Sequence, residues 1–404
     1  MTALVHVTTV PDSLLFLVGQ VGFMEDRGYT VSVVTSPGGK LDAFAAREGV
    51  AAYGVEMARK VTPLRDLVTV LRLVRIFRSI RPEIVHAHTP KGGLLGMISA
   101  TLAGVPVRVY HMRGLPLMTA SGPRRTLLRA TEKVSCQLAG RVICVSHSLR
   151  EVALAEGLCA PDKIEVALAG SGNGVDSGGK FNPARLRTGA RQAVRSELGI
   201  PQDALVFGFV GRLVCDKGVV ELATAWRGIA ARHPEAHLVL VGPYEEGDPV
   251  PQDVRRALAE DPRVHLVGFC DDTPSMYAAM DVVVLPTYRE GFPNVPLEAA
   301  AMGLPVVATR IPGCVDAVAD GLTGTLVPAA DAGALEAALD RYAADEPLRR
   351  AHGAAGRTRV ETDFCRERIW EVIAGIYARL LSEHGLTVSA KPPTGADVRH
   401  REAS

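Results

Sequence analysis

The chain has 404 residues, of which 47% are hydrophobic and 5% aromatic, and its formal net charge is +1. A chain of this length can bury two ordinary hydrophobic cores, so we expect two domains. No apolar run reaches about 18 residues and the first ten residues lack a charged start, so neither a membrane-spanning helix nor a secretory signal is expected. Seven scattered cysteines, none in a C-x-x-C pair, favour reduced thiols in a cytoplasmic protein.

The small net charge hides an uneven distribution. Residues 1–200 contain 25 Lys and Arg against 15 Asp and Glu, whereas residues 201–404 contain 20 against 29. A basic half predicts an anionic partner. Nucleic acid is not expected, because the sequence shows no interleaving of aromatic and basic residues, no zinc-finger spacing and no helix-turn-helix pattern. An anionic membrane surface or a lipid that carries a diphosphate fits the charge better.

Short apolar strands alternate with helical stretches along the first half of the chain. The first helix is expected over residues 14–27. Strand and helix in such alternation predict an α/β fold with a doubly wound parallel sheet. The expected strands lie at residues 4–8, 31–35, 50–55, 83–87, 107–111 and 141–145.

The helix expected over residues 64–80 has two different faces. One stripe should pack on the sheet and consists of Val70, Leu73, Ile76, Phe77 and Ile80. The opposite half mixes five arginines, counted through residue 81, with five aliphatic side chains. A helix at the surface of an anionic membrane uses both kinds of residue, so such a surface is the partner expected here. The alternative is that the aliphatic residues meet a neighbouring loop or subunit.

Two histidines end the fourth expected strand. His86 and His88 lie two residues apart in a strand and therefore face the same side. A metal site would need at least a third ligand, and none stands near them in the sequence. We therefore expect no metal site here.

A segment rich in glycine and serine, GSGNGVDSGGK, begins at Gly170 and marks a linker. It leads into a polar helix expected at residues 190–198. Beyond it the alternation resumes, which predicts a second doubly wound sheet with strands at 205–210, 237–241, 264–267, 282–285, 305–308 and 325–327.

The segment EGFPNVPLE, from Glu290 to Glu298, joins an apolar strand to a helix. Unpaired amides at the start of that helix should attract a phosphate. Its two carboxylates suit hydroxyl groups instead, so Glu298 could hold the hydroxyls of a ribose and Glu290 those of a second sugar. Arg212 and Lys217 follow the strand at 205–210, and two cations and two helix starts could converge at the ends of neighbouring strands.

Three segments together resemble the retaining family-four glycosyltransferases of GT-B fold. They are GR with DKG within residues 211–218, EGFPNVPLEA from Glu290, and SGNGVD at 171–176. The resemblance covers residues 8–384, and the first half is similar to a subgroup that acts on bacterial polysaccharide and lipid-linked glycans. It implies two Rossmann-like domains whose parallel sheets face a central cleft. The expected parts are an acceptor domain at 1–170, a linker at 171–204, a nucleotide-sugar domain at 205–364, a helix crossing back at 365–385 and a disordered tail at 386–404.

The resemblance also assigns residues. The turn at 268–272, which contains Phe269, resembles the place where relatives hold the nucleobase. Many relatives have a histidine near the donor hexose where this chain has Arg113, and His111 lies two residues earlier on the same face, so either could line the transfer site. The residues expected in catalysis are Arg212, Lys217, Glu290, and Arg113 or His111, and those expected to bind the donor are Gly211, Asn173, Phe269, Gly291, Phe292, Pro293, Asn294, Val295 and Glu298.

The expected reaction follows from these residues and from the resemblance. The chain contains no D-x-D sequence, so we expect neither a metal nor a cofactor, and Arg212 and Lys217 should neutralise the leaving diphosphate. The resemblance implies retention of configuration. We expect transfer of a hexose or N-acetylhexosamine from UDP to an acceptor such as a lipid-linked cell-envelope glycan precursor, in the cytoplasm or at the inner face of the membrane. The alternatives are a transferase for a soluble natural-product scaffold, a sugar-nucleotide epimerase of similar fold and a sensor of sugar nucleotides.

Overall fold

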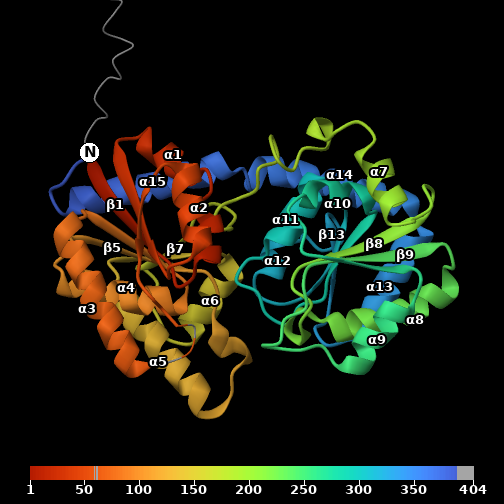
Figure 1. The fold of residues 1–404 in the computed structure, drawn as a ribbon, viewed down its shortest axis with the longest axis horizontal. Coiled ribbons are helices and arrows are strands. Elements are labelled where there is room, and N and C mark those ends of the chain that lie inside the picture. Colours follow the sequence, from red (N-terminus) through yellow and green to blue (C-terminus); the bar gives the residue numbers. More distant parts are fainter. Residues whose placement is uncertain (59, 61, 389–404) are drawn as a thin grey trace, which may run out of the picture. The chain divides into compact units, whose positions relative to one another are not determined.

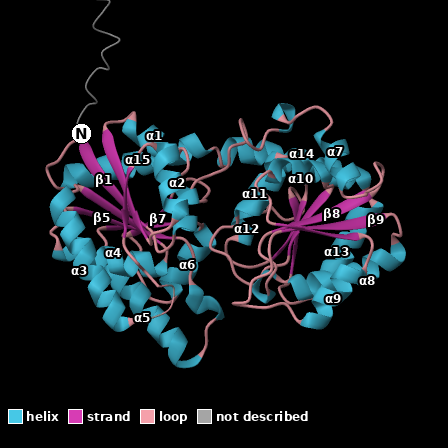
Figure 2. Cartoon of the chain, in the orientation of Figure 1, coloured by secondary structure: helices cyan, strands magenta, loops and turns pink. Residues whose placement is uncertain are grey.

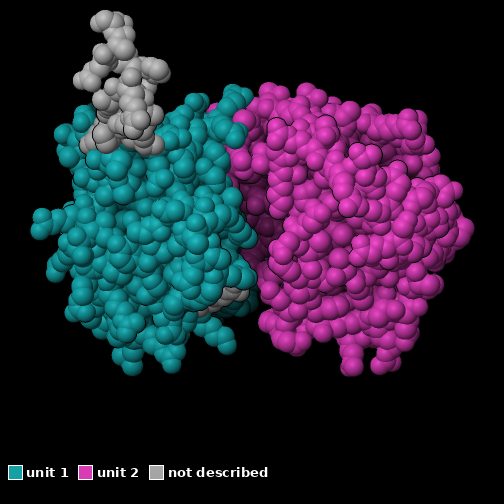
Figure 3. All heavy atoms as spheres, turned by 45° about the horizontal axis from the view of Figure 1, so that its top comes forward, with its two compact units in different colours: residues 1–144, 153–167, 367–404 teal, residues 145–152, 168–366 magenta. Residues whose placement is uncertain are grey.

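In the computed structural model, residues 1–58, 60 and 62–388 are described, so most of the tail predicted at 386–404 lies outside the described residues. The described chain forms two compact units (Figure 3). The first contains Met1–Cys144, Ala153–Ala167 and residues 367–388, and the second contains Val145–Val152 and Leu168–Arg366. The segment predicted as a linker, 171–204, is thus part of the second unit, together with residues 145–152.

The first unit is built on a seven-stranded parallel sheet with the order β3-β2-β1-β4-β5-β6-β7 (Figure 2). The prediction of a doubly wound parallel sheet is confirmed, and each of the six expected strands is present to within two residues at either end. The seventh strand was not predicted, because three residues are too few to show a pattern. The strands are β1 (Thr2–Val7), β2 (Tyr29–Thr35), β3 (Ala51–Gly54), β4 (Ile84–His88), β5 (Val107–Met112), β6 (Arg141–Cys144) and β7 (Ile164–Val166).

One helix prediction in this unit was wrong. The helix expected over 14–27 is divided into a 3-10 helix, η1, and a short α1, because Gly19 between them has a φ of 79° that a continuing helix does not allow. None of the described helices combines the length and apolar character that crossing a membrane requires. The helices are η1 (Pro11–Leu17), α1 (Gln20–Glu25), α2 (Gly39–Glu48), α3 (Pro63–Ile80), α4 (Pro90–Leu102), η2 (Pro116–Thr119), α5 (Gly122–Leu138), α6 (His147–Ala155), shared with the second unit, and α15 (Arg366–Glu383).

Helices cover both faces of the first sheet. Helices α3, α4 and α5 lie on one face, and α1 and α15 lie on the other (Figure 1). Alternate residues of a strand face opposite sides, so Ala87 packs against Gly96 of α4 while His86 reaches the hydroxyl of Tyr377 on α15.

Helix α3 buries a stripe that differs slightly from the predicted one. Val70, Leu73 and Phe77 are buried as predicted, whereas Ile76 and Ile80 are only half-buried. Val74 is also buried, although it is one of the five aliphatic side chains that the sequence placed on the opposite half. The opposite half is open to solvent and includes four apolar side chains, Leu64 (83% exposed), Leu67, Val68 and Leu71.

The second unit contains a six-stranded parallel sheet with the order β10-β9-β8-β11-β12-β13. All six strands were predicted to within one residue. Two hydrophobic cores lie on its two faces, so that Phe207 and Phe209 belong to one core while Val206 and Val210 belong to the other. The strands are β8 (Leu205–Val210), β9 (Ala236–Val241), β10 (Val264–Gly268), β11 (Val282–Leu285), β12 (Val306–Thr309) and β13 (Gly324–Val327).

The helices of the second unit divide between the two cores. Helices α8 and α13 pack on the side of Phe207, and α10, α11 and α14 pack on the side of Val206. The helices are η3 (Pro183–Arg185), α7 (Ala190–Glu197), η4 (Cys215–Lys217), α8 (Val219–Arg232), α9 (Gln252–Glu260), α10 (Thr273–Ala279), α11 (Asn294–Ala301), α12 (Cys314–Ala317), α13 (Ala332–Ala344) and α14 (Glu346–Asp363).

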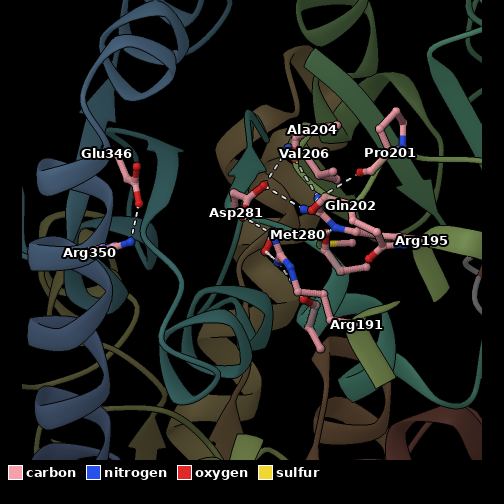
Figure 4. Close-up of polar contacts among 12 residues, drawn as sticks. Arg191, Arg195, Pro201, Gln202, Ala204, Val206, Met280, Asp281, Glu346 and Arg350 are labelled. Carbon is pink, nitrogen blue, oxygen red and sulfur yellow. Dashed lines mark hydrogen bonds and ion pairs between the residues drawn. The ribbon is translucent and has the colours of Figure 1, made fainter. Parts of the chain in front are cut away.

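A buried arginine ties α7 to the second sheet. Arg195 is fully buried, donates to the carbonyl oxygens of Gln202 and Ala204 at 2.9 and 2.8 Å, and pairs with Asp281 at 2.9 Å (Figure 4). Asp281 directly precedes β11 and also accepts from the amide of Val206 in β8 at 2.8 Å. This network explains why the predicted linker belongs to the second unit.

Candidate active site

The order of strands in the second sheet reverses between β8 and β11. From β8 the chain passes to β9 on one side, and from β11 it passes to β12 on the other side. The loops that follow β8 and β11, residues 211–218 and 286–293, therefore leave the same edge of the sheet in opposite directions. Such a switch point is where ligands bind in open α/β sheets.

Main-chain and side-chain contacts join these two loops. The Asp216 carbonyl oxygen accepts from the amide of Tyr288 at 2.9 Å, and the Asp216 carboxylate pairs with Arg289 at 3.0 Å. Gly218 has a φ of 71°, and a Cβ there would lie 2.0 Å from the carbonyl oxygen of Pro286. Glycine is therefore required at this position for the loops to approach each other.

Lys217 and Glu290 form an ion pair across the two loops. Their side chains are 18% and 15% exposed, so both are partly shielded from water yet reachable. The cation and the acid that the sequence placed after neighbouring strands thus lie together.

Arg212 lies in the same loop as Lys217, but its guanidinium pairs with Glu245 at 2.7 Å and is 49% exposed. Glu245 follows β9, on the other side of β8. The backbone there is tightly packed, because a Cβ at Gly242 would lie 1.9 Å from the carbonyl oxygen of Gly211. Arg212 is thus held by an acid that the sequence did not indicate, and Lys217 is the cation of this loop that pairs with Glu290.

Glu298 has its own partner. The hydroxyl of Tyr277, on α10, donates to Oε2 of Glu298 at 2.8 Å, and the carboxylate is half-buried. Burial raises the pKa of Glu298 above its ordinary value, while the Tyr277 hydrogen bond and Lys180 oppose that change. The side chain is therefore held in one orientation at the second turn of α11.

The start of α11 presents main-chain amides. The N-cap is Pro293, and no side chain of the described residues caps the helix. Asn294 is exposed and Val295 half-buried. Their amides have the positive end of the helix dipole behind them, which suits an anion.

The turn before α11 is held by residues 145–148. Ser146 Oγ donates to the carbonyl oxygen of Gly291 at 2.8 Å, and Asp316 accepts from the amides of His147 and Ser148 at 3.0 and 3.2 Å. A Cβ at Gly313 would lie 2.5 Å from the same Gly291 oxygen. Sequence reasoning missed this support, because its members are about 145 to 170 residues apart and only the order of the strands brings them together.

Asn173 and Phe269, which were also predicted to bind the donor, differ in their exposure to solvent. Asn173 is half-buried and lies beside Gly174, where a Cβ would be 2.5 Å from the carbonyl oxygen of Phe364. Phe269 follows β10, and its side chain is 74% exposed. An aromatic ring this exposed offers an open face for stacking.

Arg113 and His111 belong to the first unit and differ in access. His111 is buried on the sheet, its ring 5.2 Å from that of His86, and burial holds its pKa well below the ordinary value. Arg113 lies just beyond β5 and is half-buried, with its guanidinium 4.3 Å above the ring of Phe16. Of the two candidates, Arg113 is the one that a ligand can reach.

The histidine pair has a neighbour that the sequence did not reveal. His6, on β1, lies opposite His86 in the register, and one ring nitrogen from each of His6, His86 and His88 falls within 4.8 Å of the others. Arg113 donates from Nε to Nδ1 of His88 at 3.1 Å. A guanidinium bonded to one of three candidate ligands repels a divalent cation, so this contact disfavours a metal ion among them.

Comparisons with known proteins identify the family of this chain. A family model described as glycosyl transferases group 1 matches residues 204–345, and one described as glycosyl transferase 4-like domain matches residues 20–170. The capsular polysaccharide biosynthesis glycosyltransferase CapM of Staphylococcus aureus is 33% identical over 378 residues, which are 94% of this chain and 97% of CapM. The chain belongs to the family-four glycosyltransferases.

Another sequence relative and several solved structures are also similar to this glycosyltransferase. The Escherichia coli UDP-Gal:alpha-D-GlcNAc-diphosphoundecaprenol alpha-1,3-galactosyltransferase is 28% identical over 351 residues, covering 85% of this chain and 88% of that enzyme. The Anabaena protein HepE, solved with UDP, superposes with a TM-score of 0.74 at 21% identity, covering 94% of this chain and 100% of HepE. HepE has also been solved with UDP-glucose, at a TM-score of 0.76. This glycosyltransferase therefore has the GT-B fold that the resemblance implied.

Proposed function

We propose that this glycosyltransferase moves a hexose or N-acetylhexosamine from a UDP-sugar to a lipid-linked precursor of a cell-envelope glycan. The similarity to CapM supports a role in polysaccharide synthesis. The name of the Escherichia coli relative specifies both a UDP-sugar and a diphosphoundecaprenol acceptor, and the HepE structures hold UDP and UDP-glucose. In this proposal the protein works in the cytoplasm, at the inner face of the membrane.

The Lys217–Glu290 pair at the switch point, beside the uncapped start of α11, is the observation that carries the proposal. An ammonium group and main-chain amides at the same edge of a sheet are suited to binding a diphosphate. A carboxylate next to them can accept hydrogen bonds from the hydroxyls of the sugar attached to that diphosphate. The site thus offers complementary groups for both halves of a sugar diphosphate.

The predicted residues of the second unit then have the following roles. Lys217 and the amides of Asn294 and Val295 stabilise the charge that grows on the leaving diphosphate. Glu290 orients the hexose, and Glu298, held by Tyr277, binds the ribose hydroxyls. The exposed ring of Phe269 stacks on the nucleobase, while Asn173 and the backbone of Gly211, Gly291, Phe292 and Pro293 shape the surrounding loops.

The mechanism we propose retains the configuration of the transferred sugar. Glycosyl transfer passes through an oxocarbenium-like state, so stabilising the departing diphosphate is the main task. The acceptor hydroxyl attacks the face that the diphosphate leaves, and a phosphate oxygen takes its proton. Lys217 and Arg212 supply positive charge near the diphosphate, and on this basis we propose that transfer does not require a divalent metal.

The exposed half of α3 supports a membrane-bound acceptor. Leu64, Leu67 and Leu71 are exposed there, together with the exposed Arg72 and Arg75. Apolar and basic side chains on one helix face bind an anionic bilayer surface together. We expect the protein to sediment with phosphatidylglycerol vesicles, and Arg72→Glu with Arg75→Glu to weaken this strongly, whereas Arg350→Glu on α14 serves as the matched control.

A panel of nucleotide sugars tests the proposed reaction. The protein is incubated with each sugar nucleotide, with and without a bacterial membrane lipid extract, and free nucleotide is measured. We expect release of UDP that depends on the lipid extract. UDP release that needs no lipid but requires a water-soluble scaffold would support the alternative acceptor, and a changed nucleotide sugar without any acceptor would indicate an epimerase.

A further inference from the structure

Four histidines line one face of the first sheet beside Arg113. His6 lies on β1, His86 and His88 on β4, and His111 on β5, where the register pairs His6 with His86 and His88 with His111. All four rings are buried. They form a rigid imidazole layer under the carboxyl edge of the sheet, and Arg113 lies at its end.

The hydrogen bonds within this layer determine where the protons are. Arginine can only donate, so Nδ1 of His88 must accept the bond from Arg113 Nε. A neutral His88 then carries its proton on Nε2 and donates it to Nδ1 of His6 at 2.9 Å. This chain fixes the orientation of His88 and, through it, that of Arg113.

Arg113 has no counterion among the described residues. Its hydrogen bond goes to a neutral imidazole, and its plane rests on the ring of Phe16. Burial lowers the pKa of Arg113 to about 9, and among the nearby groups only the Tyr377 hydroxyl opposes that effect. A partly buried cation without an acid partner lowers the stability of a folded protein. Such a residue is typical of a site that binds an anion.

The surroundings of Arg113 add positive potential. Helix α4 has thirteen residues and begins at Pro90, two positions after His88, so the positive end of its dipole lies at the same edge of the sheet. Thr89 does not cap the helix, and the amide of Gly92 in its first turn donates to Oγ1 of Thr9 at 2.9 Å, so α4 contributes the field of its dipole here. Because Nε of Arg113 is already used, its two terminal nitrogens remain to bind two oxygens of one anion.

We propose that Arg113 is an anion-binding residue of the first unit that takes a phosphoryl group of the acceptor, and that His88 is the residue that positions it. The choice of the acceptor as the source of the phosphoryl group rests on the proposed function, whereas the anion site itself rests on Arg113 and its neighbours alone. A phosphate or diphosphate matches the two parallel N–H groups of a guanidinium.

The test uses the intact protein saturated with UDP, so that the donor site is occupied, and titrates inorganic pyrophosphate while thermal unfolding is followed. We expect pyrophosphate to raise the Tm of the wild type, Arg113→Gln to abolish that shift, and Arg113→Lys to retain part of it. Arg113→Gln should also raise the Tm measured without pyrophosphate, because an unpaired charge is removed. Arg108→Gln is the matched control, since Arg108 lies on the same strand and donates to the carbonyl oxygens of Leu138 and Val105.

Two further variants test the positioning role of His88. His88→Gln keeps an oxygen that can accept from Arg113 and should retain pyrophosphate binding within a few-fold of wild type, whereas His88→Leu should weaken it on the order of tenfold or more. Nitrogen-15 NMR of the imidazoles should show His88 protonated on Nε2. A different tautomer, or equal binding by His88→Leu, would overturn this role.

Different results would overturn the anion site and the assignment of its ligand to the acceptor. An unchanged pyrophosphate shift in Arg113→Gln, or a lower Tm without pyrophosphate, would overturn the anion site. A shift seen only before UDP is added would mean that the donor supplies the phosphoryl group, which contradicts the acceptor assignment. None of these measurements needs turnover. The anion site at Arg113 can therefore be confirmed or rejected even if the proposed transferase activity is not found.

Discussion

Lys217 and Glu290 hold each other in place when no ligand is bound. Both side chains are mostly shielded from water, and an ion pair in such a place needs good geometry to offset the loss of hydration. An ammonium group has three donors, so Lys217 can keep Glu290 while it binds a phosphate oxygen. In the proposed function, Glu290 is thereby positioned to contact the sugar that follows the diphosphate.

Replacing Glu290 by Gln should separate turnover from nucleotide binding. We expect kcat to fall at least tenfold because the hexose hydroxyls lose a charged acceptor and keep only a neutral amide oxygen, while the Kd for UDP, which lacks a hexose, changes by less than about threefold. Steady-state kinetics and calorimetry measure the two quantities. Glu336→Gln is the matched control, since Glu336 pairs with Arg232 in the same unit. A large loss of UDP affinity in Glu290→Gln would contradict the role given to this side chain.

The partners of single side chains were only partly predictable from the sequence. The meeting of Lys217 with Glu290 was predictable, because each follows a strand and parallel strands end at one edge. The partners Glu245 of Arg212 and Tyr277 of Glu298 were not, since both sit on loops or helices whose paths the spacing does not define. His6 was missed for the same reason, being 80 residues from His86.

At the scale of elements, α7 depends on one buried charge. Arg195 and Arg191 both pair with Asp281, but Arg195 is fully buried whereas the Arg191 side chain is 37% exposed. Removing the Arg195 side chain leaves the carbonyl oxygens of Gln202 and Ala204 without the guanidinium that donates to them. The exposed partner can be replaced by water.

Arg195→Ala should therefore destabilise the second unit by about 3–5 kcal/mol, and Arg191→Ala by about 1 kcal/mol or less. Urea unfolding of both variants beside the wild type measures the difference. Equal losses of stability in the two variants would show that burial of the Arg195–Asp281 pair is not what anchors α7.

Helix α5 carries a buried acid with an altered titration. Burial raises the pKa of Glu132 to about 7, while the hydroxyl of Tyr110, which donates to its Oε2 at 2.7 Å, opposes that change. The folded state therefore holds this proton more tightly than the unfolded state does. The resulting stability is fully present below pH 4.5 and is lost as the pH rises through about 7.

Glu132→Gln removes this dependence. Relative to the variant, the wild type should lose up to about 3 kcal/mol of unfolding free energy between pH 4.5 and pH 8. Urea unfolding of both proteins at the two pH values measures the change. The same difference between wild type and variant at both pH values would contradict the titration of Glu132.

The elements themselves were largely predictable. Runs of Val, Ile and Leu between helical stretches indicated twelve of the strands, because strands of a parallel sheet are buried on both faces and read as continuous apolar segments. The short β7 and the break at Gly19 were not recognised, since three residues show no period and a single glycine does not by itself end a helix. On α3, Val74 proved to be buried because the neighbouring α4 covers a wider stripe than the sheet alone would.

At the scale of the whole molecule, the two units share one principle of construction. Each is a doubly wound parallel sheet whose carboxyl edge carries the residues of interest, Arg113 in the first unit and Lys217, Glu290 and Glu298 in the second. The unit boundaries could not be predicted to the residue, because contacts such as those of Arg195 and Asp316 decide where the linker segments belong.

We propose that Lys217 and Glu298 bind the nucleotide of the donor in the second unit. Calorimetric titration of UDP into the wild type, Lys217→Ala and Glu298→Ala tests it most directly, with Arg232→Ala, at the opposite end of α8 from Lys217, as the control. We predict UDP binding that is about 10- to 100-fold weaker in the first two variants, because each loses a charge-assisted hydrogen bond, and unchanged in the control. Wild-type affinity for UDP in folded Lys217→Ala and Glu298→Ala would contradict the account.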